Sequence, residues 1–82
     1  MITPNKYMTW EEAVKAYPDH YVVFDENAKI GRVGRPLEGM VIAVCTNDEI
    51  DDFRIKCRHE GKVIYFDRTR FTTKYGGYYT NL

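Results

Sequence analysis

The sequence predicts an α+β fold in which two helices accompany a small mixed sheet of three to four strands, in the order α-β-β-α-β. Two segments repeat apolar residues at helical spacing, three segments are rich in β-branched and aromatic residues, and glycine or proline separates them. The 82 residues, 44% of them hydrophobic, have the size and composition of one domain. We expect residues 1–67 to form that α+β domain and residues 68–82 to be a basic, aromatic C-terminal extension that packs on it or serves as an interface.

The first helix is expected to begin at a capping box made by Thr9 and Glu12, which are three residues apart. Pro18 ends this helix, because proline disfavours helical geometry in the residue before it. One helix face then carries Trp10, Ala13, Val14 and Tyr17. The β-branched and aromatic run at residues 20–25 predicts the first strand.

The connection over residues 26–39 contains three glycines and a proline, and we expect a long loop in which residues 30–33 form at most an irregular hairpin arm. The nearly continuous apolar run from Met40 to Thr46 predicts a central strand covered on both faces. This strand and the first should form an antiparallel hairpin.

The second helix is expected to open at a capping box of Thr46 and Glu49 and to end at Gly61. Its acidic residues come first and its basic residues last, as the helix dipole favours. Its inward stripe should be Ile50, Phe53 and Cys57. A last strand over residues 62–67 is expected beside Met40–Thr46 and parallel to it, with both helices on one face of the sheet.

Charge is divided unequally along the chain, although lysine plus arginine equals aspartate plus glutamate. Residues 54–82 contain seven basic and two acidic residues, and the residues before them contain ten acidic and five basic ones. Helix electrostatics explains part of this division. The remainder coincides with a cluster of aromatic residues near the C-terminus, which indicates a contact surface.

The strongest candidate site is therefore the C-terminal extension, together with the basic residues of the long connection. Basic and aromatic side chains alternate there, which suits stacked bases and phosphates as well as protein hot spots. Three interpretations stay open: the extension is structural or self-associating, it binds a partner protein, or it binds nucleic acid or a nucleotide. The candidate binding residues are Arg68, Arg70, Phe71, Lys74, Tyr75, Tyr78 and Tyr79 in the extension, and Lys29, Arg32 and Arg35 in the connection.

Other chemistry is weakly indicated. The possible metal ligands are Cys45, Cys57, His20 and His59. The chain lacks the close pairs of ligands that zinc sites use, so we expect no metal or other cofactor. The spacing of the cysteines and histidines favours neither a nucleophile with its base nor a catalytic site, so we expect no enzyme activity. The acidic run from Asp48 to Asp52 lacks the calcium-loop pattern and is typical of a helix start.

No segment has the roughly 18 consecutive apolar residues of a membrane span, and no signal peptide is evident, so we expect a cytoplasmic protein. The two cysteines should then be reduced thiols packed in the core.

Several short motifs carry a resemblance. They are Trp10-Glu11-Glu12-Ala13, Tyr17-Pro18, Tyr21-Val22-Val23 and Gly39-Met40-Val41-Ile42-Ala43, followed by an acid-started helix and a strand that ends near Phe66. Over residues 9–67 this pattern resembles a small α-β-β-α-β domain of bacteria and archaea, which also occurs in gut Firmicutes and their mobile elements and has no established activity. The chain departs from that pattern in its basic connection and its aromatic extension, where a particular function would have been added.

These observations together predict a small, non-catalytic binding module that acts through protein–protein contact. The small size of the chain and the habitat of the domain that it resembles suggest, by association only, an inhibitor of a host defence system carried by a phage or mobile element, in the manner of an anti-CRISPR protein. The alternative is a nucleic-acid or nucleotide binder that uses the basic, aromatic extension. We expect another protein as partner, no membrane contact, and self-association into a homo-oligomer.

Overall fold

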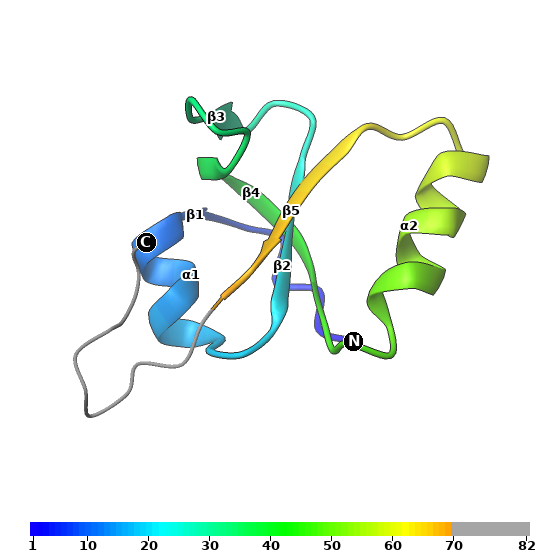
Figure 1. The fold of residues 1–82 in the computed structure, drawn as a ribbon, viewed down its shortest axis with the longest axis horizontal. Helices are drawn as coiled ribbons and strands as arrows, with labels where there is room; N and C mark the ends of the chain where they lie inside the picture. The colour runs from blue at the N-terminus through cyan, green and yellow to red at the C-terminus, as the bar shows by residue number, and fades with distance from the viewer. Residues whose placement is uncertain (70–82) are drawn as a thin grey trace.

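The structure, a computed structural model, describes residues 1–69, and these form a small α+β fold with five strands and two helices (Figure 1). All strand pairs are antiparallel. The strand order is β1-β4-β2-β5, and β3 also pairs with β4. The elements are β1 (Lys6–Thr9), α1 (Trp10–Ala16), β2 (Tyr21–Asp25), β3 (Lys29–Ile30), β4 (Pro36–Cys45), α2 (Ile50–His59) and β5 (Ile64–Arg68).

The prediction of a mixed sheet was wrong, because the last strand does not pair with β4. β5 pairs with β2, which lies between the two strands that were expected to be neighbours. The reason is that both edges of β4 are already occupied, by β2 on one side and by β1 on the other. The sequence analysis missed β1, and it therefore gave β4 a free edge and counted three to four strands where the structure has five.

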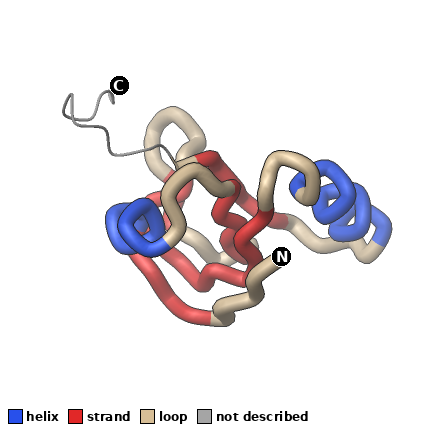
Figure 2. The backbone as a smooth tube through the Cα atoms, turned by 90° about the horizontal axis from the view of Figure 1, so that it is seen from below, coloured by secondary structure: helices blue, strands red, loops and turns tan. Residues whose placement is uncertain are grey.

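The prediction that both helices lie on one face of the sheet was also wrong. Figures 1 and 2 show α1 and α2 on opposite sides of the strands. In β2, Val22 and Phe24 pack in the core cluster under α1, and Val23 packs in the cluster under α2. The continuous apolar runs of β2 and β4 are thus buried on both faces, as was expected of the central strand.

A register shift between β2 and β4 changes which side chains of β4 face each helix. Val23 pairs with Ala43 and Phe24 pairs with Val41, so Ile42 is an extra residue on the β4 side. A bulge of this kind inserts one residue and bends the strand. As a result Ile42 and Ala43 both pack in the cluster under α2, and Val41 remains under α1.

The caps of α1 confirm the predicted capping box. The Glu12 amide donates to Thr9 Oγ1 at 3.1 Å, and the Thr9 amide donates to Glu12 Oε1 at 2.9 Å. The box predicted for α2 is only half formed, because the Thr46 amide donates to Glu49 Oε1 at 2.9 Å but no side chain caps the helix. Residues 47–49 form a turn instead, and α2 begins at Ile50.

The end of α2 is a Schellman motif. The Lys62 amide donates to the Cys57 carbonyl at 2.9 Å, and the Gly61 amide donates to the Arg58 carbonyl at 3.1 Å. Gly61 has φ of 71°, which is the left-handed conformation that this motif requires and glycine adopts at no steric cost. The predicted end of the helix at Gly61 is confirmed.

β4 is longer than predicted and begins at Pro36, because β3 pairs with its first residues. The pairing segment is Lys29–Ile30 rather than the arm expected over residues 30–33. Gly39 allows Ala28 to approach closely: a Cβ atom at position 39 would lie 2.7 Å from the Ala28 Cβ and 2.8 Å from its Cα.

Thr69 fixes the chain directly after β5. Its side chain is fully buried, and its hydroxyl donates to the carbonyl of Tyr17 and accepts from the His20 amide at 3.0 Å. The Thr69 amide also donates to the His20 carbonyl at 2.8 Å. The turn between α1 and β2 is therefore tied to the end of β5.

Both cysteines are buried free thiols, in agreement with the expected core packing. Burial raises the pKa of the Cys45 thiol above its ordinary value. Ile50, Phe53 and Cys57 form the predicted inward stripe of α2: Ile50 and Cys57 are buried, and Phe53 packs against the cluster that contains Ile50. No helix within residues 1–69 has the length and apolar character needed to cross a membrane.

Candidate functional site

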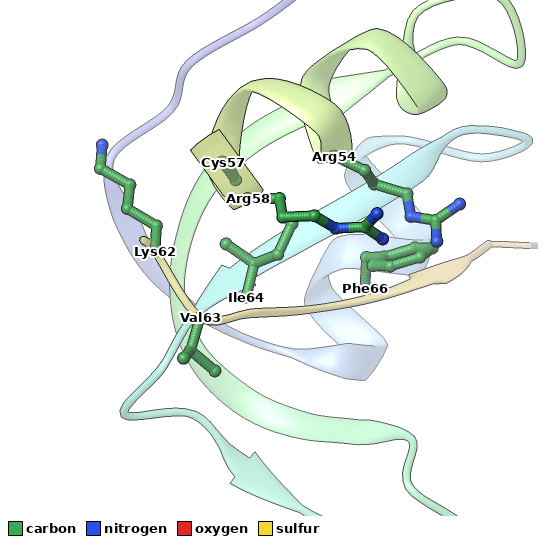
Figure 3. A pocket seen from close by; sticks show the side chains of 7 residues that line it. All are labelled: Arg54, Cys57, Arg58, Lys62, Val63, Ile64 and Phe66. Atoms are coloured by element: carbon green, nitrogen blue, oxygen red, sulfur yellow. The ribbon is translucent and has the colours of Figure 1, made fainter. Parts of the chain in front are cut away.

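A groove of about 260 Å³ lies between α2 and β5. Its walls combine three of the long cationic side chains of α2 and its C-terminal turn with apolar side chains in and just before β5 (Figure 3). The lining residues are Arg54, Cys57, Arg58, Lys62, Val63, Ile64 and Phe66. We call this feature the basic groove.

The local structure explains why these cations gather. Arg54 and Arg58 are four residues apart on α2 and therefore lie on the same side of the helix. The Schellman turn then reverses the chain and places Lys62 at the other end of the groove. In β5, Ile64 and Phe66 alternate with residues of the opposite face and pack in the cluster under α2.

Figure 3 shows that the side chains of Arg54 and Arg58 both extend toward Phe66. The Arg54 guanidinium lies over the Phe66 ring, 5.1 Å from its centroid. The Phe66 and Tyr21 rings are tilted at a centroid distance of 6.2 Å, and the Arg68 guanidinium lies 6.0 Å from the centroid of the Tyr21 ring. The two aromatic rings are thus flanked by an arginine at each end, which is a favourable cation–π arrangement.

Positive charge in the basic groove is only partly balanced. None of the seven lining residues is acidic. Arg54 lies 3.3 Å from Asp51, and Lys62 lies 3.5 Å from Glu60, in partly exposed ion pairs that contribute little to stability. Arg58 has no carboxylate within 4.0 Å among residues 1–69.

The chemistry available to the basic groove is anion binding. Two guanidinium groups beside an aromatic ring provide planar hydrogen-bond donors that suit carboxylate or phosphate oxygens. The Cys57 thiol forms part of the lining but is 3% exposed, and no histidine or carboxylate accompanies it there. The lining therefore offers donors and positive charge rather than a pair of groups that could transfer protons.

The structure places Arg68, one of the predicted binding residues, at the end of β5 and fixes it there. It forms an ion pair with Asp19, and its Nε donates to Asn47 Oδ1 at 3.1 Å. Its side chain joins β5 to the turns before β2 and before α2.

The predicted basic residues of the connection lie in and beside the hairpin that β3 forms with β4. Lys29 lies 3.4 Å from Glu38, and Arg32 is exposed in the turn between β3 and β4. Arg35 donates from Nε to Asp67 Oδ2 at 2.7 Å and lies 5.9 Å from the centroid of the Trp10 ring. Lys29 and Arg35 are thus paired with different carboxylates, and a shared role of these three cations in binding stays a prediction.

The other predicted binding residues fall outside the residues that the structure describes. They are Arg70, Phe71, Lys74, Tyr75, Tyr78 and Tyr79. Their proposed role in contacting protein or nucleic acid stays a prediction.

The sequence analysis missed the basic groove, since it interpreted the cations of α2 as helix-dipole partners. The available signal was the pair of arginines at i and i+4 next to the inward Cys57. A further signal was the glycine that turns the chain back beside the same helix. Neither signal reveals that β5 carries an aromatic ring to the same place.

The four residues that the sequence offered as possible metal ligands have different surroundings in the structure. Cys45 and Cys57 are buried, His59 is exposed, and the His20 ring nitrogen Nδ1 lies 2.9 Å from the Pro18 carbonyl. Within residues 1–69, no three residues of the types His, Cys, Asp and Glu are grouped so that they could hold a metal ion.

Outside the basic groove, Tyr7 on the edge strand β1 donates to Glu38 Oε2 at 2.7 Å. This hydrogen bond raises the pKa of Tyr7, and it lowers the pKa of Glu38, which the nearby Lys29 lowers further. The pair is exposed and joins β1 to β4.

Comparison with known proteins gives no match to the chain among protein-family models, curated proteins or solved structures.

Proposed function

We propose that this protein is a small, non-catalytic binding module that contacts an acidic segment of another protein through the basic groove. The observation that carries the proposal is the groove's lining of three cations without a carboxylate, in which Arg58 lacks an acidic partner among the described residues. Arginine and aromatic side chains are enriched at protein interfaces, where they often dominate the binding energy.

A protein partner suits this surface better than a nucleic acid. The basic groove is short, and Asp51 and Glu60 lie beside its cations. These carboxylates repel a backbone that carries a phosphate at every nucleotide, whereas a protein segment can place uncharged residues beside them. The Phe66 ring is already flanked by Tyr21 and Arg54, so its faces are not open for stacking a base.

Affinity capture from bacterial lysate, with and without nuclease, tests the proposal. The bait is the tagged chain, compared with Arg54→Gln/Arg58→Gln and with the control Lys6→Gln/Lys15→Gln. The control removes two exposed cations from β1 and α1, away from the groove. We expect a recurring protein that survives nuclease, is retained by the control and is lost with the groove variant.

Two results would contradict the proposal. Recovery that disappears with nuclease would instead support the nucleic-acid alternative. Recovery that is equal for both double variants would show that the contact lies elsewhere, for example in the C-terminal extension. A target in a host defence system stays a prediction from the resemblance, and the identity of the captured protein would test it.

A further inference from the structure

β5 is an edge strand within the part of the chain that the structure describes. It pairs with β2 on one side, and no strand of residues 1–69 pairs with its other side. The basic groove lies along this strand, because Ile64 and Phe66 both line it. A free strand edge presents unpaired backbone groups to any extended segment that approaches it.

The hydrogen bonds between β5 and β2 show which backbone groups of β5 point away from β2. The Thr69 amide donates to the His20 carbonyl at 2.8 Å, so residue 69 is bonded inward. In an antiparallel pair, inward-bonded residues alternate with outward ones. The backbone groups of Asp67 and Tyr65 therefore point toward β2, and those of Ile64, Phe66 and Arg68 point away from it.

The outward amide of Arg68 already has a hydrogen-bond partner. The Arg68 amide donates to Asp67 Oδ1 at 2.8 Å, which confirms its outward direction and occupies its hydrogen. The other oxygen of Asp67 accepts from Arg35 at 2.7 Å. The edge is thus blocked at its C-terminal end, and the outward groups of Ile64 and Phe66 remain.

The side chains of the same two residues face α2. Residues opposite each other in neighbouring antiparallel strands have Cβ atoms about 5 Å apart. A side chain opposite Phe66 on an added strand would therefore lie beside the Phe66 ring, where the Arg54 guanidinium is 5.1 Å from the ring centroid. Arg58 extends toward the same place (Figure 3).

We propose that an extended acidic segment of a partner protein adds as an antiparallel strand to the free edge of β5. The segment pairs with the backbone of Ile64 and Phe66 and places alternate carboxylates beside Arg54 and Arg58. This inference rests on the proposed function and specifies its geometry: main-chain hydrogen bonds provide affinity, and the basic groove selects acidic side chains.

Charge complementarity favours this occupant over two others. The chain's own residues 70–82 contain Arg70 and Lys74 and no aspartate or glutamate. A second copy that paired through β5 would bring another Arg54 and Arg58 to the same groove. Like charges placed opposite each other destabilise a strand pair.

The test uses blocked peptides that alternate threonine and glutamate over eight positions. If glutamates lie opposite Phe66 and Ile64, then their amides donate to β5, and the threonine amides point away from it. Two N-methylated isomers with the same charge and the same number of methyl groups form a matched pair. One carries the methyl groups on glutamate nitrogens and the other on threonine nitrogens.

We expect methylation on glutamate to weaken binding by about tenfold or more, as the loss of one to two hydrogen bonds implies, and methylation on threonine to change it little. Arg54→Gln/Arg58→Gln should weaken binding of the unmethylated peptide by about tenfold or more at low salt, and Lys6→Gln/Lys15→Gln should not. Bound peptide should slow hydrogen exchange of the Ile64 and Phe66 amides.

Equal affinity of the two isomers, together with unchanged exchange at these amides, would overturn strand addition. If Arg54→Gln/Arg58→Gln still weakened binding, the basic groove would stand as a protein-binding site without the strand geometry. Absence of binding up to about 1 mM peptide, or pairing of two copies through β5, would also overturn the inference. The lysate experiment would then decide the proposed function separately.

Discussion

The two faces of the sheet differ in how completely they are closed. Under α1, Phe24 is fully buried, and Arg35 over Trp10 is paired with Asp67. Under α2, the core is also packed, but a groove remains between the helix and β5, and Arg58 has no acidic partner among residues 1–69. Under the proposed function, the α1 face serves stability and the α2 face leaves charge available for binding.

The largest expected effect compares two phenylalanines on these faces. Phe24→Ala should lower the free energy of unfolding by about 3–5 kcal/mol, because it leaves a cavity at a fully buried site. Phe66→Ala should cost less than half as much, since Phe66 is half-buried at the groove. Urea unfolding of both variants measures the two values, and equal losses would contradict the distinction between a closed and an open face.

The next effect concerns the Thr69 hydroxyl, which joins the end of β5 to the turn between α1 and β2. Thr69→Val keeps the side-chain shape but leaves the Tyr17 carbonyl and the His20 amide without their buried partner. We expect a loss of about 1–3 kcal/mol in thermal or urea unfolding. Thr69→Ser retains the hydroxyl and serves as the control. If valine and serine are equally stable, packing rather than hydrogen bonding decides the role of Thr69.

A smaller effect should separate the arginines of the two faces. Arg35→Gln removes a hydrogen bond of 2.7 Å to Asp67, in a pair that is partly exposed, so we expect a loss of up to about 1 kcal/mol. Arg58→Gln should change stability by less than about 0.5 kcal/mol, because its guanidinium has no carboxylate partner among the described residues. A larger loss of stability from Arg58→Gln than from Arg35→Gln would contradict the assignment of a stabilising role to Arg35 rather than to Arg58.

The smallest effect depends on pH and lies at Tyr7, beyond the part of the sheet that α2 covers. The lowered pKa of Glu38 stabilises the fold above the ordinary glutamate pKa, and this contribution is lost as pH falls through the folded pKa. The raised pKa of Tyr7 contributes below the ordinary tyrosine pKa and is lost as pH rises through the folded value.

Tyr7→Phe removes this hydrogen bond. The difference in melting temperature between the variant and the natural chain should therefore be greatest near neutral pH and should shrink near pH 3, below the ordinary glutamate pKa of about 4.3. Melting curves at both pH values provide the measurement. A difference that does not change with pH would mean that tyrosine acts through packing alone.

Local sequence signals predicted the parts of the fold that depend on neighbouring residues. The capping box of Thr9 and Glu12, the end of α2 at Gly61 and the antiparallel pairing of the first predicted strand with the central strand all follow from short-range chemistry. Sheet order does not, because it depends on which edges are free. β1 was missed since only Met8 of its four residues is buried, and the alternation is too short to recognise.

The candidate site could be predicted less well, for a related physical reason. Cations of α2 satisfy the helix dipole, and that local explanation is sufficient in the sequence. Their second role arises only because β5 returns along α2 with Phe66 facing the helix, which is a tertiary feature. Partners distant in sequence are equally hidden for the basic connection: Arg35 pairs with Asp67 on β5, which its sequence neighbours do not indicate.

The position of β2 between β4 and β5 leads us to expect an order in which the sheet is assembled. Val23 pairs with Ala43 on one side, within a hairpin, and with Phe66 on the other, across α2 and both loops. Closing the longer loop costs more entropy, so the hairpin forms before β5 docks. The basic groove needs β5 as one wall, so it is complete only once β5 has docked.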